Sequence, residues 1–382
     1  MLNRRNLIPA LLLLFLLSLF ALHLLQYRFH RIKIEPLDGY YLDATKIKFS
    51  WKGWFSASYQ EAEDQYLNDH FGFRPLFVRL NHQLRFSLFN KVKTAWVIVG
   101  KNNYLYEHNY IKAEYGVDFI GYDSISTRMY KFEQLQHKLD TLGTKLIAVF
   151  ASGKGTFYPE YIPDNYYDWR GSTNIEVYRH YAEKWNINCI DFNKHFINLK
   201  EKSPYPLYPQ YGIHWSRYSA CLATDSIVRY IEKLCNMEMP HIYWDKINMS
   251  RPQGRDKDIS DAMNLFFPPR SFPMAYPEIK IESDSGKTKP SLLVVADSFH
   301  RVIYDLEVLD DLFTNPRWWY YNKEIYPDCF HTWLTTDDVN FEEEVLKYDV
   351  IIILSTDANL PNFGWGFIEN GYDLFCSQNE TN

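Results

Sequence analysis

The sequence predicts an α/β fold in which helices cover both faces of a doubly wound parallel sheet. Short apolar runs, each the length of a strand, alternate along the chain with longer stretches of helical periodicity. Such runs are typical of parallel strands, because these strands are buried on both faces. The four runs are KLIAVFAS (145–152), NCIDF (188–192), SLLVVADS (291–298) and YDVIIILS (348–355).

The N-terminus predicts a membrane anchor. Residues 7–25 are almost all apolar and are close to the length that crosses a bilayer. Arg4 and Arg5 precede them, and no small-residue cleavage site follows cleanly. We expect residues 1–33 to be a cytoplasmic tail and an uncleaved transmembrane signal anchor in the cell membrane, with the body facing the periplasm or the cell exterior. A cleaved signal peptide is the alternative.

The remaining elements are predicted in chain order. Residues 34–60 form a juxtamembrane connector, and residues 61–382 form the α/β domain. Residues 237–290, rich in Pro, Met and charge, are expected to be an insertion on the active-site side of this domain. A β-hairpin is expected at 97–106, where VIVG and YLY flank a turn. Helices are expected at 61–90, 124–142, 173–185, 215–235, 256–267, 300–313 and 339–347.

Composition and charge exclude several classes of function. The first 33 residues carry five basic side chains and no acid, which leaves 36 basic and 47 acidic residues, or −11, on the body. This charge argues against nucleic acid as a partner and makes a polyanionic polymer a less favourable one. The five cysteines lack the spacing of a zinc site, and no P-loop, GxGxxG, HExxH or GxSxG motif is present. We expect no metal and no cofactor.

Two short segments predict acyl transfer. Ser298 ends a buried strand and precedes a helix, so its hydroxyl and backbone N–H lie where a developing oxyanion is favoured. His214 lies in GIHWS, where a loop enters a helix. Each residue has a simpler interpretation, as a helix N-cap for Ser298 and as a buried structural histidine for His214. Together they supply the nucleophile and the base that acyl transfer needs.

Further candidates follow the strands at the edge where sites of such sheets lie. Ser152, Asp191 and Asp297 fall on that edge. Lys154 follows the first strand between two glycines, which would let the backbone approach a ligand closely; a surface turn is the alternative. We assign Lys154, Ser152 and Trp215, which adjoins His214, to substrate binding, and Ser152 is also a rival nucleophile.

The motifs also resemble those of a known family. The chain resembles the AlgX/AlgJ-like group of alginate O-acetyltransferases, within the SGNH-hydrolase-like superfamily. Its histidine precedes its serine, which is similar to the permuted order of that group. The resemblance rests on five stretches in the family's order: NDHFGFR (68–74), VIVGKNNYLY (97–106), SGKGTFYPEYIP (152–163), GIHWS (212–216) and VVADSF (294–299).

The resemblance implies that Ser298 is the nucleophile and His214 the general base, with the stretch around Lys154 beside the site. The family's aspartate lies two residues before the histidine, where this chain has Gly212. Losing the carboxylate that orients the imidazole can lower the rate by orders of magnitude. Asp191 and Asp297 are the candidate replacements. A Ser–His dyad and an inactive site are the alternatives.

The implied function is O-acetylation of an exported or cell-surface polysaccharide. The serine takes an acetyl group from a donor, and a sugar hydroxyl then attacks the acyl-enzyme. The resemblance implies a multi-pass membrane acyltransferase as the partner that supplies acetyl groups. An acetyl esterase of the same fold is one alternative. A non-catalytic polysaccharide-binding or assembly subunit is another, favoured by Gly212 and by the 18% aromatic content.

Overall fold

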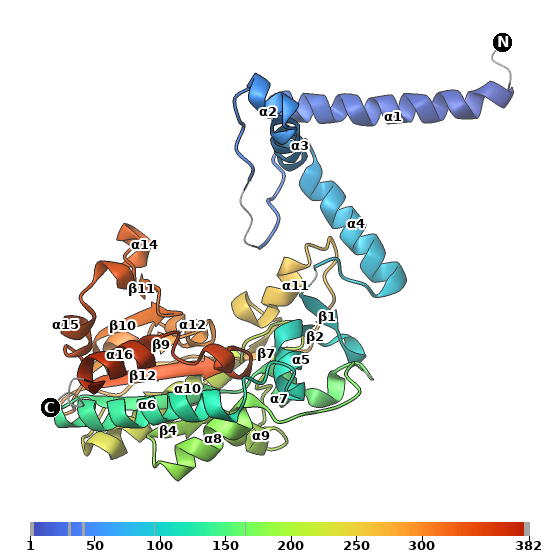
Figure 1. Cartoon of the computed structure of the whole chain (residues 1–382). Coiled ribbons are helices and arrows are strands. Elements are labelled where there is room, and N and C mark those ends of the chain that lie inside the picture. The colour runs from blue at the N-terminus through green and yellow to red at the C-terminus, as the bar shows by residue number, and fades with distance from the viewer. Residues whose placement is uncertain (1–3, 30–31, 40–42, 95, 165, 378–382) are drawn as a thin grey trace. The chain divides into compact units, whose positions relative to one another are not determined.

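The computed structural model describes residues 4–29, 32–39, 43–94, 96–164 and 166–377 (Figure 1). The chain divides into two compact units, one of Met1–Ala95 with Ser260–Pro269 and one of Trp96–Ile259 with Arg270–Asn382. Positions 1–3, 30 and 31 of the predicted tail and anchor, and 40–42 of the predicted connector, lie outside the described residues.

The first unit contains the predicted anchor. Helix α1 (Arg4–Phe29) includes Leu7–Phe29, with a mean hydropathy of 2.6, which is long and apolar enough to cross a membrane; a signal sequence has the same properties. The single helix predicted over 61–90 is instead two helices. The chain breaks where Phe73 adopts left-handed backbone angles (φ 64°) and a proline enters the first turn of the next helix. The other helices are α2 (Trp51–Phe55), α3 (Ser58–His70) and α4 (Arg74–Phe89).

A six-stranded sheet organises the second unit, in the order β11-β10-β9-β12-β3-β4. All neighbouring strands are parallel except the antiparallel pair β10 and β11. Each of the four predicted runs forms one of these strands, which confirms the predicted fold class. The strands are β3 (Lys145–Ala151), β4 (Cys189–Asp191), β9 (Ser291–Ala296), β10 (Thr314–Tyr320), β11 (Glu324–Tyr326) and β12 (Val350–Thr356).

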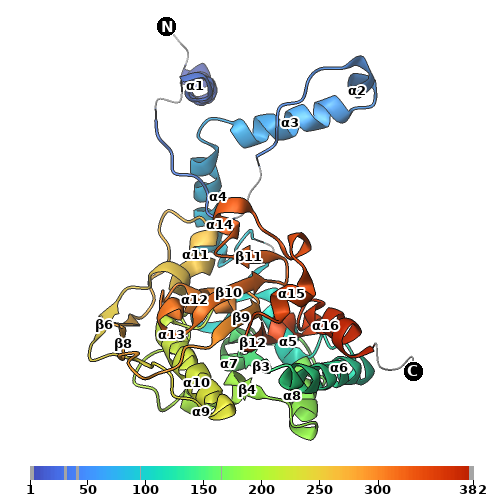
Figure 2. The same cartoon turned by 90° about the vertical axis from the view of Figure 1, so that its left-hand side faces the viewer.

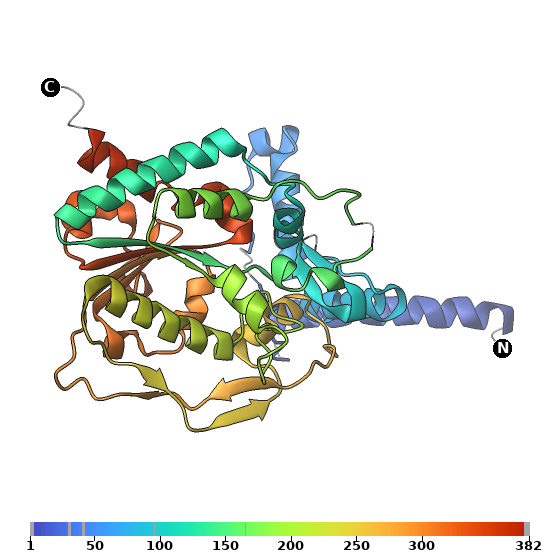
Figure 3. The same cartoon turned by 90° about the horizontal axis from the view of Figure 1, so that it is seen from below.

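Helices cover both faces of this sheet (Figures 2 and 3). Alternate side chains of the strands face opposite layers: Leu293 and Val295 pack with α6, whereas Leu292 and Val294 lie with Ile227 of α10. One layer holds α6 (Tyr122–Thr141), α8 (Asn174–Lys184) and α16 (Phe367–Phe375), and the other holds α10 (Arg217–Cys235) and α12 (Phe299–Tyr304).

Shorter elements complete the chain; all lie in the second unit except α11, of which residues 260–262 belong to the first. The predicted hairpin is present as β1 and β2. The helix predicted over 300–313 is two short helices, α12 and α13, and the one predicted over 256–267 is reduced to a 3₁₀ turn and a short α11. These elements are β1 (Val97–Val99), η1 (Lys101–Asn103), β2 (Leu105–Glu107), α5 (His108–Tyr115), α7 (Lys154–Phe157), η2 (Pro159–Tyr161), α9 (Phe192–Leu199), β5 (Ile242–Tyr243), β6 (Ile247–Ser250), η3 (Gly254–Lys257), α11 (Asp258–Ala262), β7 (Met274–Pro277), β8 (Lys280–Ile281), α13 (Leu309–Leu312), α14 (Cys329–Thr332), η4 (Thr336–Asp338), α15 (Phe341–Val345) and η5 (Asp357–Asn362).

The carboxyl edge of the sheet gathers the polar residues that follow the strands. Along this edge Tyr321 follows β10, Asp297 and Ser298 follow β9, Asp357 follows β12 and Ser152 follows β3. The chain continues from β3 to β4 in one direction along the sheet and from β9 to β10 in the other. Ligand sites of α/β sheets form beyond the strand ends where such a reversal occurs.

Candidate active site

Ser298 lies in the turn between β9 and α12. Five of the six residues of β9 are buried, which fixes where the turn begins. The Ser298 side chain makes no capping hydrogen bond to the helix that follows. Instead, its Oγ lies 3.0 Å from Nε2 of His214. The Ser298 hydroxyl is therefore paired with an imidazole and not used as a helix cap.

His214 is held in the loop that enters α10. Its side chain is 6% exposed, and the helix that follows is capped by Ser216, whose Oγ accepts a hydrogen bond from the Ser219 amide. The His214 Nδ1 lies 2.7 Å from Oδ2 of Asp258. The other carboxylate oxygen of Asp258 accepts a hydrogen bond from the Ile213 amide at 2.9 Å. A proton on Nδ1 that points to a carboxylate leaves Nε2 free to accept the serine proton.

The carboxylate beside His214 is thus Asp258, at the start of α11, and not one of the two candidates named from the sequence. Asp191 caps α9 through the Lys194 amide and forms an ion pair with Arg179 at 2.5 Å. Asp297 accepts hydrogen bonds from the amide and hydroxyl of Thr356, at 2.8 and 2.7 Å. Each of these carboxylates is engaged with partners other than His214.

Gly212 explains why the acid comes from elsewhere. A Cβ atom at this position would lie 2.5 Å from the carbonyl oxygen of Arg255 and 2.9 Å from the carbonyl carbon of Asp256. The backbone that leads to Asp258 therefore occupies the space that a side chain at 212 would need. The backbone segment that excludes a side chain at position 212 is therefore the same segment that brings Asp258 to His214.

The three residues assigned to substrate binding are buried and contact protein. Lys154, Ser152 and Trp215 each have no exposed surface. The Lys154 Nζ donates to the carbonyl oxygens of Gln210 and Gly212, both at 2.7 Å, and burial lowers the pKa of its amine well below the usual range. The Trp215 indole donates to the Phe299 carbonyl at 3.2 Å. We propose positioning roles for Lys154 and Trp215 in place of substrate contact.

Ser152 and the glycines beside Lys154 also serve internal packing. The Ser152 carbonyl accepts a hydrogen bond from the Tyr208 hydroxyl at 2.5 Å, and its side-chain oxygen lies 3.4 Å from the Gly153 carbonyl. A Cβ atom on Gly155 would lie 2.3 Å from the Tyr110 carbonyl oxygen. The close backbone approach expected of this loop is therefore made to α5.

Ser298, His214 and Asp258 form a triad. Two further side chains, Tyr321 and Glu107, lie near it and were not singled out from the sequence. Tyr321 has left-handed backbone angles (φ 51°), and its phenol lies near enough to Ser298 for the serine side chain to lower the pKa of the phenol. Burial raises the pKa of Tyr321 above its usual value, so the phenol keeps its proton. Burial also raises the pKa of the Glu107 carboxyl; the charge of His214 lowers it and that of Asp258 raises it. Tyr321 was missed because the strand before it, β10, was not predicted.

Chemically, the arrangement combines an activated hydroxyl, an oriented imidazole and a nearby hydrogen-bond donor. These are the groups that attack a carbonyl carbon and stabilise the oxyanion that results. Among the described residues, no group of three or more His, Cys, Asp or Glu side chains is placed to hold a metal ion.

Comparison with known proteins gives structural matches only. No protein-family model matches the chain, and no curated protein matches its sequence. The chain is similar to the O-acetyltransferase domain of Pseudomonas putida AlgJ, with 12% identity and a TM-score of 0.47 over 72% of this chain and 98% of that one. Pseudomonas aeruginosa AlgX matches at 12% identity and a TM-score of 0.44, over 72% of this chain and 67% of that one.

Bacillus cereus PatB1 matches at 12% identity and a TM-score of 0.42, over 71% of this chain and 99% of that one. At these scores the similarity by itself assigns no activity to this chain. The matched structures include AlgJ and AlgX, after which the group that the motifs resemble is named.

Proposed function

We propose that this protein is a membrane-anchored, serine-dependent O-acetyltransferase that acts on hydroxyl groups of an exported or cell-surface polysaccharide. The observation that supports it most directly is the continuous hydrogen-bonded chain from Ser298 through His214 to Asp258. The absence of an acid at position 212 favoured a non-catalytic role. That argument is weaker now, because Asp258 supplies the carboxylate beside His214.

In the proposed first half-reaction, the Ser298 Oγ attacks the acetyl carbon of the donor while Nε2 of His214 takes the serine proton. Asp258 stabilises the imidazolium through Nδ1. The protonated phenol of Tyr321 lies beside Ser298 and donates a hydrogen bond to the oxygen that becomes negative. The leaving group of the donor departs with the proton from His214, and the acetyl ester of Ser298 remains.

In the second half-reaction, a sugar hydroxyl attacks the Ser298 ester and gives its proton to His214. The serine leaves, recovers that proton and is ready for another cycle. An uncleaved α1 would hold this chemistry at the membrane surface. In this proposal the body faces the periplasm or the cell exterior, and a multi-pass membrane acyltransferase supplies the acetyl groups.

The test uses the full chain in detergent micelles with p-nitrophenyl acetate as the donor. We expect an acetyl adduct on Ser298 by mass spectrometry, lost in Ser298→Ala and strongly reduced in His214→Ala. A Ser298→Ala variant that keeps full activity would exclude the mechanism. Folded wild-type protein with neither adduct nor turnover would favour the non-catalytic binding subunit.

An acetyl esterase would use the same triad. The two activities differ in what attacks the acyl-enzyme. Adding a sugar acceptor should divert acetyl groups from water to the sugar, which mass spectrometry of the acceptor detects. Hydrolysis that is unaffected by any acceptor would identify an esterase.

A further inference from the structure

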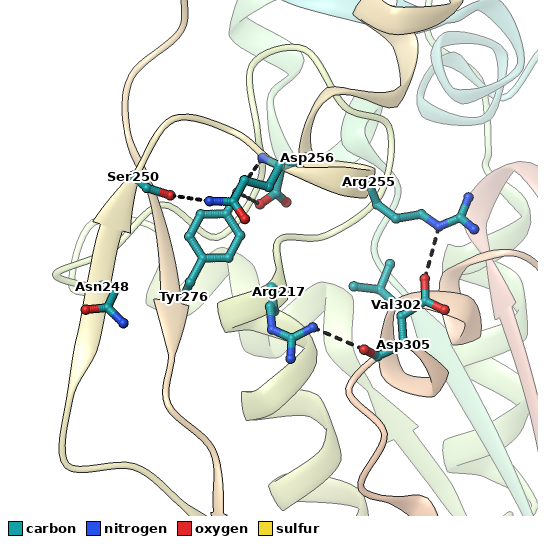
Figure 4. A pocket seen from close by; sticks show the side chains of 10 residues that line it. Arg217, Asn248, Ser250, Arg255, Asp256, Tyr276, Val302 and Asp305 are labelled. Carbon is teal, nitrogen blue, oxygen red and sulfur yellow. Dashed lines mark hydrogen bonds and ion pairs between the residues drawn. The ribbon is translucent and has the colours of Figure 1, made fainter. Parts of the chain in front are cut away.

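A pocket of about 520 Å³ lies in the second unit, between the antiparallel pair β6 and β7, the start of α10 and the end of α12 (Figure 4). Its volume is within the range of small-molecule sites, about 300–1,000 Å³. Polar side chains dominate the wall: Arg217, Asn248, Gln253, Arg255, Tyr276 and Asp305.

The pocket adjoins the triad, because the same three chain segments build both. Arg217 is three residues after His214, Asp256 is two residues before Asp258, and Val302 is four residues after Ser298. Two residues span at most about 7 Å of extended chain and three at most about 11 Å, and four residues of helix rise about 6 Å. Each triad residue therefore lies within about 11 Å, measured along the chain, of a residue of the wall.

The wall contains two arginines and two carboxylates, and one of the carboxylates, Asp305, also pairs with Arg301 outside the wall at 3.0 Å. The two guanidinium groups both bind Asp305: Nη1 of Arg217 donates to its carbonyl oxygen at 3.1 Å and Nε of Arg255 to its carboxylate at 3.3 Å (Figure 4). Each guanidinium has five N–H groups, of which Asp305 takes one. The second carboxylate of the wall, Asp256, accepts a hydrogen bond from the Tyr276 hydroxyl at 2.7 Å. An anion would meet two carboxylates here, and a cation would meet two arginines.

The remaining groups match a sugar. Asn248 and Gln253 have amide side chains that both donate and accept hydrogen bonds, as sugar hydroxyls do. The ring of Tyr276 belongs to the same wall and offers an aromatic surface to the apolar face of a sugar ring. The net charge of −11 on the body outside residues 1–33 further disfavours a polyanionic chain.

We propose that this pocket binds a neutral sugar unit of the acceptor polysaccharide and so brings a neighbouring hydroxyl to the Ser298 ester. The inference rests on the proposed transferase function. The hydroxyl oxygen forms the new bond to the acetyl carbon, its proton passes to Nε2 of His214, and the bond to Ser298 Oγ breaks. Ser298 then recovers the proton from His214.

The test measures acetyl transfer by the full chain in detergent micelles, with p-nitrophenyl acetate as the donor. Cellopentaose serves as the neutral acceptor and pentagalacturonic acid as its anionic counterpart. The pocket variant is Arg255→Gln, which removes a charged donor. The matched control is Arg229→Gln on α10, whose side chain is 61% exposed, pairs with Asp225 and is not part of the pocket wall.

We expect transfer to cellopentaose to exceed transfer to pentagalacturonic acid. Arg255→Gln should raise the KM for cellopentaose about ten-fold with a smaller change in kcat, as for the loss of a hydrogen bond to a charged group. Arg229→Gln should keep the wild-type values. If Arg255→Gln does not fold, Asn248→Ala tests the same wall with an exposed side chain and should also raise KM.

The outcomes separate the two proposals. A wild-type acetyl adduct on Ser298, with KM unchanged in both Arg255→Gln and Asn248→Ala, overturns the pocket assignment and leaves the transferase proposal intact. Preference for pentagalacturonic acid, or transfer to neither oligosaccharide, overturns the neutral-sugar assignment. The absence of any adduct in folded wild-type protein overturns the transferase proposal itself.

Discussion

Gly212→Ala is the change that most directly probes how the triad acid is delivered. The new Cβ would lie 2.5 Å from the Arg255 carbonyl oxygen, whereas ordinary contacts begin at 3.4 Å, so about 0.9 Å of movement is needed. The nearest obstructing atom is a backbone carbonyl oxygen three residues before Asp258, which cannot rotate away as a side chain would. Displacing a catalytic group by about 1 Å can reduce the rate about 100-fold.

We therefore expect kcat/KM for p-nitrophenyl acetate to fall about 100-fold in Gly212→Ala. The free energy of unfolding should fall by about 1–3 kcal/mol, as is typical when a packed site is overfilled. Both are measured on the detergent-solubilised full chain, by absorbance for the rate and by thermal unfolding for stability.

Gly143→Ala is the matched control for this substitution. Gly143 has φ 91° and no atom within 4 Å of its would-be Cβ, so alanine is strained there but displaces nothing. A left-handed backbone costs a non-glycine residue about 1–2 kcal/mol. This variant should lose stability and keep its rate. Equal rates in Gly212→Ala and the wild type would refute the view that the backbone packed against Gly212 sets the position of Asp258.

Three other predictions follow from the same contacts. Asp258→Asn should lower kcat for ester hydrolysis by about 10³–10⁴-fold, because an amide in place of the carboxylate favours the wrong tautomer of His214. Asp191→Asn should keep kcat within a few-fold of the wild type. The opposite ranking would restore Asp191 as the acid. Lys154→Met should lower the free energy of unfolding by about 1–3 kcal/mol, because two backbone carbonyls lose their buried donor, and an unchanged melting temperature would contradict this role. Burial raises the pKa of Asp256 to about 6 from an ordinary 3.8, so folding takes up a proton between these pH values. The free energy of unfolding should therefore fall by about 2 kcal/mol as pH rises from about 4 to 6, and by about 3 kcal/mol over the whole titration. This fall should be missing in Asp256→Asn. Urea unfolding at a series of pH values measures the free energy of unfolding of both proteins. The same dependence on pH in the two proteins would show that Asp256 does not titrate in this way.

The parts of the fold that the sequence predicts are those with a local signal. Uninterrupted apolar runs locate the four strands at the centre and one edge of the sheet, because burial on both faces leaves no polar positions. β10 lacks this signal: it begins with polar residues and contains Pro316, which argues against a central strand. Its pairing with β9 shifts register between Thr314 and Arg317, around that proline. Tertiary pairing overrides local preference there.

The same distinction applies to the candidate site. Ser298 and His214 stand in short motifs at the ends of predicted elements, so sequence alone brings them forward. Asp258 is 44 residues from His214, in a polar segment with several other acids, and only the path of the insertion selects it. One signal does exist: with glycine at 212 an orienting acid can come only from another segment, and residues 237–290 are expected on the active-site side.

Relocating the acid has a consequence for how this site works. Both oxygens of Asp258 bind the loop of His214, through the Ile213 amide and the imidazole, so the insertion fixes the tautomer and the position of the base together. The Arg255 side chain, from the same short segment, lies in the wall of the proposed sugar pocket. Backbone and side chains of this segment thus serve different steps. Changes that move its backbone, such as Gly212→Ala, should act on the acylation rate, whereas changes confined to its side chains, such as Arg255→Gln, should act on acceptor binding.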